Sequence, residues 1–257
     1  MKQTAYFICL GVFAVGALLV NAVSLGVCLT GRADRHRALV YGLIARLMRF
    51  FDWLIRRTGV GEIALPERFA AAEPGQPGTL FVANHTGLLD ALFLLTRIPE
   101  GQFIFKAGLV RNPLFSHTPR ALGFVINRAH LAGLVELTES LRAGRHVLIF
   151  PEGTRTETPP VNRFHAGFAH LALQSGAPIQ PIVIRNPAGV CGKNRPLSAM
   201  PPLPFGYRFG PGTPVLPQPG ESRGELTRRI ETYYHEALAG EPVILPKRRA
   251  ESSVAHA

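Results

Sequence analysis

An uncharged stretch near the N-terminus limits most strongly how this chain can fold. Residues 5–30 read AYFICLGVFAVGALLVNAVSLGVCLT and contain no Asp, Glu, Lys or Arg. The stretch exceeds the roughly 20 apolar residues that a helix needs to cross the hydrocarbon core of a bilayer. A cleavable signal peptide has a shorter apolar core that ends at a small-residue site, so the run favours an uncleaved N-terminal membrane helix.

Basic residues on the two flanks set the expected orientation of this membrane helix. Lys2 precedes the run, whereas Arg32, Arg35 and Arg37 follow it. Positive charges concentrate on the cytoplasmic side, so the rest of the chain is expected on the cytoplasmic face of the inner membrane. Asn21 near the middle, together with the glycines, also permits a hairpin or a shallow insertion with the following helix.

A basic amphipathic helix is predicted directly after the membrane helix. In RALVYGLIARLMRFFDWLIRRTG, charged side chains recur on one side and apolar side chains fill a wide face on the other. Trp53 suits the headgroup level of a bilayer, so the helix is expected to lie in the membrane interface. The alternative is a helix packed on the core of the chain's own folded domain. Residues 1–58 are therefore expected to form a membrane anchor and an interfacial helix.

The rest of the chain alternates short apolar runs with helical patterns. The apolar runs cover residues 79–83, 102–105, 124–126, 146–150 and 179–184. The helical patterns cover residues 88–96, 128–143 and 164–175. Parallel strands need crossover helices, so this order predicts an α/β domain with a mostly parallel sheet flanked by helices. Functional side chains are then expected at the carboxyl ends of the strands.

The C-terminal part of the chain predicts less regular structure. YRF at residues 207–209 stands in a stretch rich in Pro and Gly and predicts an edge strand, and residues 222–238 predict a final helix. The α/β domain is expected to extend over residues 59–245. Residues 246–257 predict a basic, disordered tail.

Composition narrows the class of partner. An apolar content of 47% rules out wholesale disorder, and a net charge of +11 indicates an anionic partner surface such as nucleic acid, phospholipid headgroups or an acidic carrier protein. The sequence has no zinc-finger spacing, basic zipper or aromatic RNA-binding motif, which disfavours nucleic acid. Cys9, Cys28 and Cys191 show no metal-binding spacing and suggest no disulfide framework, which fits a reducing compartment.

The heptapeptide NHTGLLD at residues 84–90 directly follows an apolar run. His85 is expected on the loop after the strand and Asp90 in the first turn of the next helix, where its carboxylate can reach the imidazole. Such an Asp fixes the tautomer and leaves the other ring nitrogen as a base near neutral pH. No Ser or Cys stands in a nucleophile-elbow context, so direct activation of a substrate hydroxyl is expected. The same spacing is compatible with an Asp that only caps a helix.

The hexapeptide FPEGTR at residues 150–155 follows a second apolar run. Gly153 allows a close approach of the backbone, Thr154 offers a hydroxyl, and Arg155 presents a planar fork suited to phosphate. Glu152 can accept hydrogen bonds from substrate hydroxyls or pair with Arg155. These residue types together indicate a site for a hydroxylated, anionic molecule.

NHTGLLD followed by FPEGTR resembles the glycerolipid acyltransferases, the group of PlsC-like 1-acylglycerol-3-phosphate acyltransferases. The first block of that family is His-x4-Asp and its third is Phe-Pro-Glu-Gly-Thr-Arg. GFVINR at residues 123–128 looks like the second block, and APIQPIVI at residues 177–184 looks like the fourth. The resemblance covers about residues 79–215 in matching order and spacing.

The resemblance implies roles for individual residues. His85 is the implied general base and Asp90 its orienting partner. Glu152, with Gly153 and Thr154, contacts or organises the glycerol backbone. The implied ligands of the acceptor phosphate are three cations: Arg155, Arg128 and Lys106.

Relatives of this kind need no metal and no cofactor. His165 and His170 are five residues apart in RFHAGFAH, but no third ligand stands at useful spacing, so a loop and helix-face role is expected for them.

The implied activity is transfer of a fatty acyl group to the free hydroxyl of a lysophospholipid at the membrane. The implied donor is acyl-CoA or acyl-carrier protein, and the first acceptor to consider is 1-acylglycerol-3-phosphate, which gives phosphatidic acid. FKAGLVRNP and GFVINR depart from the commonest motif sequences of the family. The acceptor could therefore also be lyso-ornithine lipid or another hydroxylated metabolite. A membrane scaffold that has lost catalysis is the alternative outside the enzymes, and nucleic acid is not an expected partner.

Overall fold

The structure is a computed structural model that describes residues 1–69, 75–98, 101–106, 112–127, 130–193, 195 and 199–240. The predicted tail at residues 246–257 and Arg128 lie outside the described residues. The backbone of Lys106 is described, but its side chain is not.

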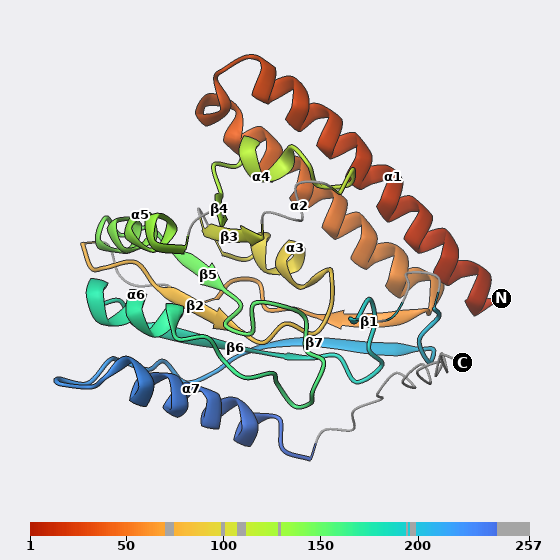
Figure 1. Ribbon diagram of the computed structural model, residues 1–257. Helices are drawn as coiled ribbons and strands as arrows, with labels where there is room; N and C mark the ends of the chain where they lie inside the picture. The colour runs from red at the N-terminus through yellow and green to blue at the C-terminus, as the bar shows by residue number, and fades with distance from the viewer. Residues whose placement is uncertain are drawn as a thin grey trace, which may run out of the picture.

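Within the described residues, seven strands form one mostly parallel sheet in the order β1-β7-β6-β2-β5-β3-β4 (Figure 1). The neighbouring strands pair in parallel except β6 and β7, which are antiparallel. This confirms the predicted α/β fold. The strands are β1 (Gly61–Ala64), β2 (Leu80–Ala83), β3 (Gln102–Lys106), β4 (Val125–Asn127), β5 (Val147–Ile149), β6 (Ile179–Arg185) and β7 (Phe205–Pro211).

The prediction of an edge strand at residues 207–209 is wrong in one respect. These residues form part of β7, but β7 lies between β1 and β6, and β1 is the edge strand. β1 was not predicted, because GEIA is short and only Ile63 in it is buried. β7 itself reads as half-buried, since Phe205, Tyr207 and Phe209 alternate with more exposed residues.

Helices cover both faces of the sheet, and the alternation of side chains along the strands fills both layers. Phe81 and Ala83 of β2 point into the core on the side of α1 to α4, whereas Leu80 and Val82 point into the core on the side of α5 to α7. The helices are α1 (Lys2–Leu29), α2 (Ala33–Thr58), α3 (Asp90–Leu95), α4 (Thr118–Ala121), α5 (His130–Arg142), α6 (Gly167–Ser175) and α7 (Arg223–Ala237).

Local signals explain where several helices begin and end. Ser222 caps α7 in a capping box with Glu225, as expected for the predicted helix at residues 222–238. Gly59 ends α2 in the left-handed conformation. The predicted helix at 128–143 corresponds to α5, of which residues 128–129 lie outside the described part.

α1 and α2 form an antiparallel pair that packs along one side of the molecule (Figure 1). Gly16 of α1 lets the helices approach, because a Cβ atom there would collide with the side chain of Leu47. α1 is long and apolar enough to cross a membrane, yet one face is buried along its whole length. The buried side chains of that face are Tyr6, Cys9, Phe13, Ala17, Val20, Asn21, Ser24 and Val27.

α2 packs on the core of the domain, which is the second of the two alternatives that its sequence allows. Val40, Ile44 and Ile55 belong to a buried face that shares one core with the sheet. Phe50 and Trp53 lie outside that face, about half exposed, with their rings stacked at 5.5 Å. The helix therefore packs on the domain and also presents aromatic side chains to its surroundings.

A buried polar cluster ties α1 to the segment before α4. Asn21 donates from Nδ2 to the Pro113 carbonyl at 2.8 Å and to Ser116 Oγ at 3.0 Å, and its Oδ1 accepts from the His117 N–H at 2.8 Å. Ser24 Oγ lies 3.3 Å from Thr118 Oγ1. The polar residues of this otherwise apolar helix thus have partners within the protein.

Candidate active site

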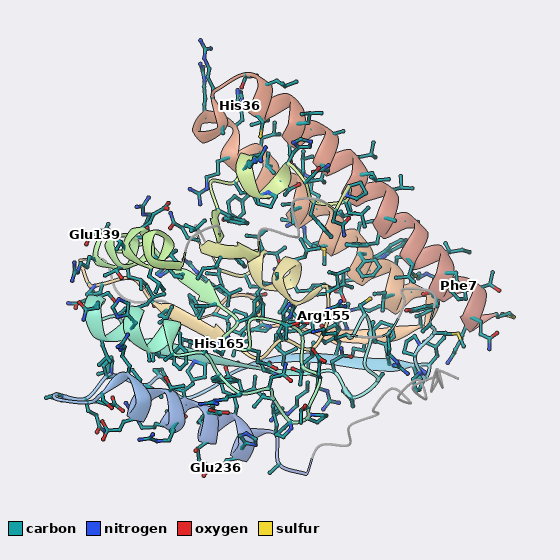
Figure 2. All side chains as sticks on the ribbon, in the orientation of Figure 1. Phe7, His36, Glu139, Arg155, His165 and Glu236 are labelled. Atoms are coloured by element: carbon teal, nitrogen blue, oxygen red, sulfur yellow. The ribbon has the colours of Figure 1, made fainter. Side chains whose placement is uncertain are left out.

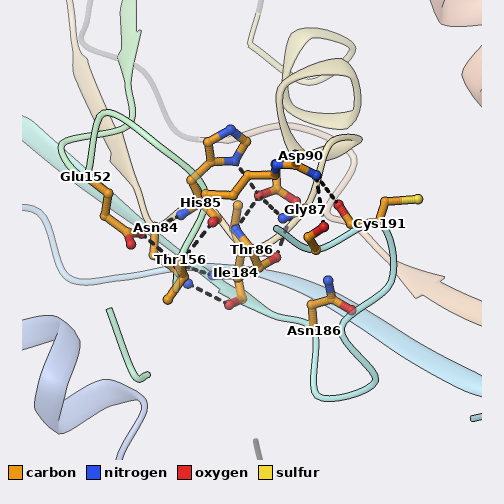
Figure 3. Close-up of polar contacts among 12 residues, drawn as sticks. Asn84, His85, Thr86, Gly87, Asp90, Glu152, Thr156, Ile184, Asn186 and Cys191 are labelled. Carbon is orange, nitrogen blue, oxygen red and sulfur yellow. Dashed lines mark hydrogen bonds and ion pairs between the residues drawn. The ribbon is translucent and has the colours of Figure 1, made fainter. Parts of the chain in front are cut away.

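Strand pairing brings the two sequence blocks together. β2 and β5 are parallel neighbours, with Val82 opposite Ile149, so the loops that follow them leave the sheet side by side. Asn84 extends this arrangement beyond the strand: it donates to the Ile184 carbonyl at 2.9 Å and accepts from the Ile184 N–H at 2.7 Å (Figure 3). NHTGLLD and FPEGTR therefore meet at the carboxyl edge of the sheet.

His85 and Asp90 form a hydrogen-bonded pair. His85 Nδ1 lies 2.9 Å from Asp90 Oδ2, and Asp90 is fully buried in the first turn of α3. The same Oδ2 accepts from the N–H groups of Thr86 at 2.6 Å and Gly87 at 2.9 Å. An ionised Asp90 makes Nδ1 the protonated nitrogen, which leaves Nε2 as an acceptor on a ring that is 21% exposed.

Phe150 orients the plane of the His85 ring. The two rings stack with their centroids 4.2 Å apart and their planes 24° from parallel. The first residue of FPEGTR thus contacts the imidazole directly.

Glu152 holds the backbone that carries His85. Its Oε1 accepts from the His85 N–H at 2.8 Å and lies 3.0 Å from Thr156 Oγ1, and its Oε2 accepts from the Asn162 N–H at 2.8 Å. Burial raises the pKa of this carboxyl group, and these hydrogen bonds oppose the rise. Both carboxylate oxygens of Glu152 accept hydrogen bonds from the protein, so Glu152 organises the loop. No pattern in the sequence singled out its partners Thr156 and Asn162.

Arg155 is held by the loop that follows β6. Its Nη1 donates to the carbonyls of Cys191 at 2.8 Å and Gly192 at 3.0 Å. In Figure 2, the labelled Arg155 lies inside the outline of the molecule near the ends of the strands. Burial raises the pKa of the Cys191 thiol to about 11, so this thiol stays protonated near neutral pH.

Lys193 is a cation of the site that the sequence did not single out. Its Nζ lies 2.9 Å from Thr154 Oγ1 and forms an ion pair with Glu157. A single Lys in a loop has no pattern that distinguishes it from a solvated charge. The fold brings Lys193 into contact with the FPEGTR loop.

The structure describes fewer contacts for the other predicted site residues. Gly153 has a φ of +64°, and a Cβ atom there would lie 3.2 Å from the His165 ring, so the loop needs a glycine. Lys106 ends β3, opposite Asn127 of β4. The phosphate contacts predicted for Lys106 and Arg128 stay predictions. Among the described residues, no group of three or more His, Cys, Asp or Glu side chains is arranged to hold a metal ion.

A small apolar pocket borders the histidine pair. Side chains of α1, α2, β1, β7 and the loop after β6 line it, together with Leu89, which directly precedes Asp90. Tyr207 is one of the lining residues of β7. Tyr207 also donates a hydrogen bond from its hydroxyl to Asp90 Oδ1. The sequence placed Tyr207 on a strand without linking it to this site.

The chain is similar in sequence to known proteins. Residues 60–185 match the model of the family described as Acyltransferase. The lyso-ornithine lipid O-acyltransferase of Pseudomonas aeruginosa is 33% identical over 258 residues, which cover 94% of this chain and 95% of that protein. The 1-acyl-sn-glycerol-3-phosphate acyltransferase of Cocos nucifera is 31% identical over 126 residues, which cover 46% of this chain and 41% of that protein.

A solved structure shows a similar fold. The crystal structure of the 1-acyl-sn-glycerophosphate acyltransferase PlsC from Thermotoga maritima matches with a TM-score of 0.67 at 21% sequence identity, over 92% of this chain and 97% of that chain. The match therefore includes more than the sheet and its flanking helices.

Proposed function

Because the chain belongs to the acyltransferase family, we propose that it transfers a fatty acyl group from a thioester donor to the free hydroxyl of a single-chain membrane lipid. The observation that carries this proposal is the His85–Asp90 pair, in which Nδ1 is bound and Nε2 is left to accept a proton. The donor is acyl-CoA or acyl-carrier protein.

The proposed reaction is a direct transfer. His85 Nε2 takes the proton of the acceptor hydroxyl while the hydroxyl oxygen attacks the thioester carbonyl. Asp90 stabilises the imidazolium that results. The new C–O bond forms, the C–S bond breaks, and the thiolate leaves with the proton from His85.

For the acceptor, we favour a lyso-ornithine lipid. The similarity to the Pseudomonas aeruginosa enzyme extends over nearly the whole of both chains, N-terminal helices included. The headgroup of that lipid carries a carboxylate and an ammonium group, and the site offers Arg155 together with the Lys193–Glu157 ion pair. A doubly charged phosphate would instead meet the carboxylate of Glu157 beside the cations.

1-Acylglycerol-3-phosphate is the second candidate acceptor. It is supported by the match to the Cocos nucifera enzyme and by two cations, Arg155 of the FPEGTR loop and Lys193, which contacts Thr154 from the loop after β6. Both acceptors have a free hydroxyl for His85.

We further propose that α1 and α2 hold the protein on the cytoplasmic face of the inner membrane, embedded from one side. The burial of one face of α1 along its whole length supports this over a clean span, because lipid surrounds the middle of a spanning helix. The exposed apolar side chains of α1, such as Phe7 at the outer edge in Figure 2, suit contact with lipid.

A panel assay tests the function. Purified full-length protein in lipid nanodiscs is given each lysolipid with acyl-CoA or acyl-carrier protein, and products are identified by mass spectrometry. We expect acylated ornithine lipid as the main product, and His85→Ala should lower kcat by about 10²- to 10⁴-fold.

The matched control is His235→Ala, which removes an exposed histidine from α7 and should leave turnover unchanged. Wild-type turnover in His85→Ala would remove the base assignment, and preferred use of 1-acylglycerol-3-phosphate would reverse the choice of acceptor.

A further inference from the structure

Among the described residues, Tyr207 is the one side chain of the strand β7 that hydrogen-bonds to the His85–Asp90 pair. It is 1% exposed and stands 117 residues after Asp90 in the chain. Its hydroxyl donates to Asp90 Oδ1, the oxygen that does not face His85. The two oxygens of Asp90 therefore have separate partners, with the phenol on one side and the imidazole on the other.

The neighbours of Tyr207 leave its ring one orientation. It stacks on Phe209 with centroids 5.0 Å apart, and Phe93 of α3 meets it edge-on at 6.2 Å. Thr86 Oγ1 lies 3.4 Å from the Tyr207 hydroxyl and 3.4 Å from Asp90 Oδ1. The hydroxyl is thus directed at the carboxylate by packing as well as by hydrogen bonding.

Gly87 makes room for this contact. A Cβ atom at position 87 would lie 2.8 Å from the Tyr207 hydroxyl and 2.6 Å from the Val190 carbonyl. Real Cβ atoms do not approach polar atoms that closely, so a larger residue would force the tyrosine or the loop to move. The glycine of NHTGLLD therefore allows the tyrosine of β7 to reach Asp90, although the two residues lie far apart in the sequence.

We propose that Tyr207 is a positioning residue for acyl transfer: its hydroxyl anchors Asp90 Oδ1 so that Oδ2 stays directed at His85 Nδ1. The proposal rests on the proposed function only in assigning His85 as the base.

The bond also tunes how firmly His85 holds a proton. A hydrogen bond donated to a carboxylate withdraws negative charge from it, so Asp90 attracts the imidazolium less strongly than it would without the phenol. The other charged groups around His85 are Glu152, which binds its backbone, and Arg155 on the adjoining loop. Without the phenol, Asp90 keeps the N–H donors of Thr86 and Gly87, and its carboxylate attracts the protonated ring more strongly.

The experiment measures the imidazole itself, so it does not depend on turnover. Full-length protein with isotope-labelled histidine rings is titrated by NMR, and the His85 signal is assigned by its loss in His85→Ala. In Tyr207→Phe, we expect the midpoint of the His85 titration to move to higher pH by about half a unit. Replacement of Tyr207 by 3-fluorotyrosine, a more acidic phenol of nearly the same shape, should move it to lower pH.

Kinetics on the same samples provide a second readout. We expect kcat of Tyr207→Phe to fall about tenfold, with the KM values for acceptor and donor unchanged and the acid limb of the pH–rate profile moved to higher pH.

Tyr234→Phe is the matched control. Tyr234 is also fully buried and donates to the Val82 carbonyl at 2.6 Å, but it does not contact the pair. This variant should lose thermal stability and keep the His85 titration of the wild type.

The outcomes separate the two proposals. An unmoved His85 midpoint in Tyr207→Phe, or equal shifts in Tyr207→Phe and Tyr234→Phe, overturns the role of Tyr207. If Tyr207→Phe does not fold, the direction of the shift in the 3-fluorotyrosine protein decides. A shifted midpoint in a protein that acylates none of the lipids supports the role of Tyr207 and overturns the proposed function.

Discussion

At the scale of single residues, two buried carboxylates hold one histidine from two sides. Asp90 binds the ring of His85, and Glu152 binds its backbone N–H. Each carboxylate also accepts backbone N–H groups from its own surroundings. The position of His85 is thus set at both ends of the residue, which limits the motion of its imidazole.

Glu152 should make the stability of the protein depend on pH. Burial raises its pKa above the ordinary value of 4.5, so the folded state holds this proton more tightly than the unfolded state does. The stability from this group is complete below pH 4.5 and is lost as the pH rises through the folded-state pKa. Between pH 4 and 7, Tm of the wild type should fall relative to Glu152→Gln by about 3 °C.

Glu236→Gln is the control for this measurement, because Glu236 is exposed on α7. Its Tm difference from the wild type should stay constant over the same range. A Glu152→Gln difference that is also constant with pH would contradict the direction of the shift.

The sequence predicted the local part of the site and missed the distant part. The 2.9 Å contact between His85 and Asp90 agrees with the reach of a residue in a first helical turn, because the two residues are only five apart in the chain. Tyr207 and Lys193 arrive from β7 and from the loop after β6. Only the strand order places them, and no spacing in the sequence records that order.

At the scale of elements, α1 is joined to the domain by polar as well as apolar contacts. Asn21 makes its hydrogen bonds with Pro113, Ser116 and His117 while buried in an apolar helix. Buried amides of this kind hold a helix in one register, since sliding by one turn would leave them without partners.

Asn21→Leu should therefore destabilise the protein. The substitution removes three hydrogen bonds between α1 and the segment before α4, which at about 1 kcal/mol each lowers the unfolding free energy by about 3 kcal/mol. Thermal unfolding in detergent measures the loss. Gln3→Leu makes the same chemical change at an exposed position of α1 and should be neutral; equal Tm values for the two variants would contradict the role of the cluster.

The strands were predicted unevenly for a physical reason. β2, β5 and β6 are buried on both faces and read as continuous apolar runs. β1 is a short edge strand that pairs only with β7, so its sequence shows little of its structure. β7 lies inside the sheet because β1 pairs with its outer side. Since β1 was not predicted, β7 was predicted as the edge strand.

At the scale of the whole molecule, the family resemblance drawn from NHTGLLD and FPEGTR is confirmed by the relatives, and the fold by the solved structure. What the sequence left open was how the N-terminal helices meet the domain. Phe51 and Ile55 of α2 lie in one core with Phe93 of α3 and Tyr207 of β7. The outer face of α1 remains apolar and exposed.

This exposed face should bind membranes. Replacing Leu18, Leu19 and Val23 by Ser removes apolar surface from the outside of α1 and should weaken co-flotation with anionic phospholipid vesicles by at least about tenfold. The matched control replaces Val135 and Leu216 by Ser, which are also exposed but lie on other elements. A tag at the N-terminus should be cut by protease from the same side as the domain; protection of the tag would show that α1 spans.

The shared core also has an evolutionary consequence. Side chains of α1 and α2 close the pocket beside Leu89 and Tyr207, and they bury residues of the sheet that would otherwise meet water. Deletion of α1 and α2 would expose the interior of the domain, so these helices cannot be lost in evolution without loss of the fold. The surface proposed to bind lipid and the side chains that complete the core lie on the same helices, so they are inherited together.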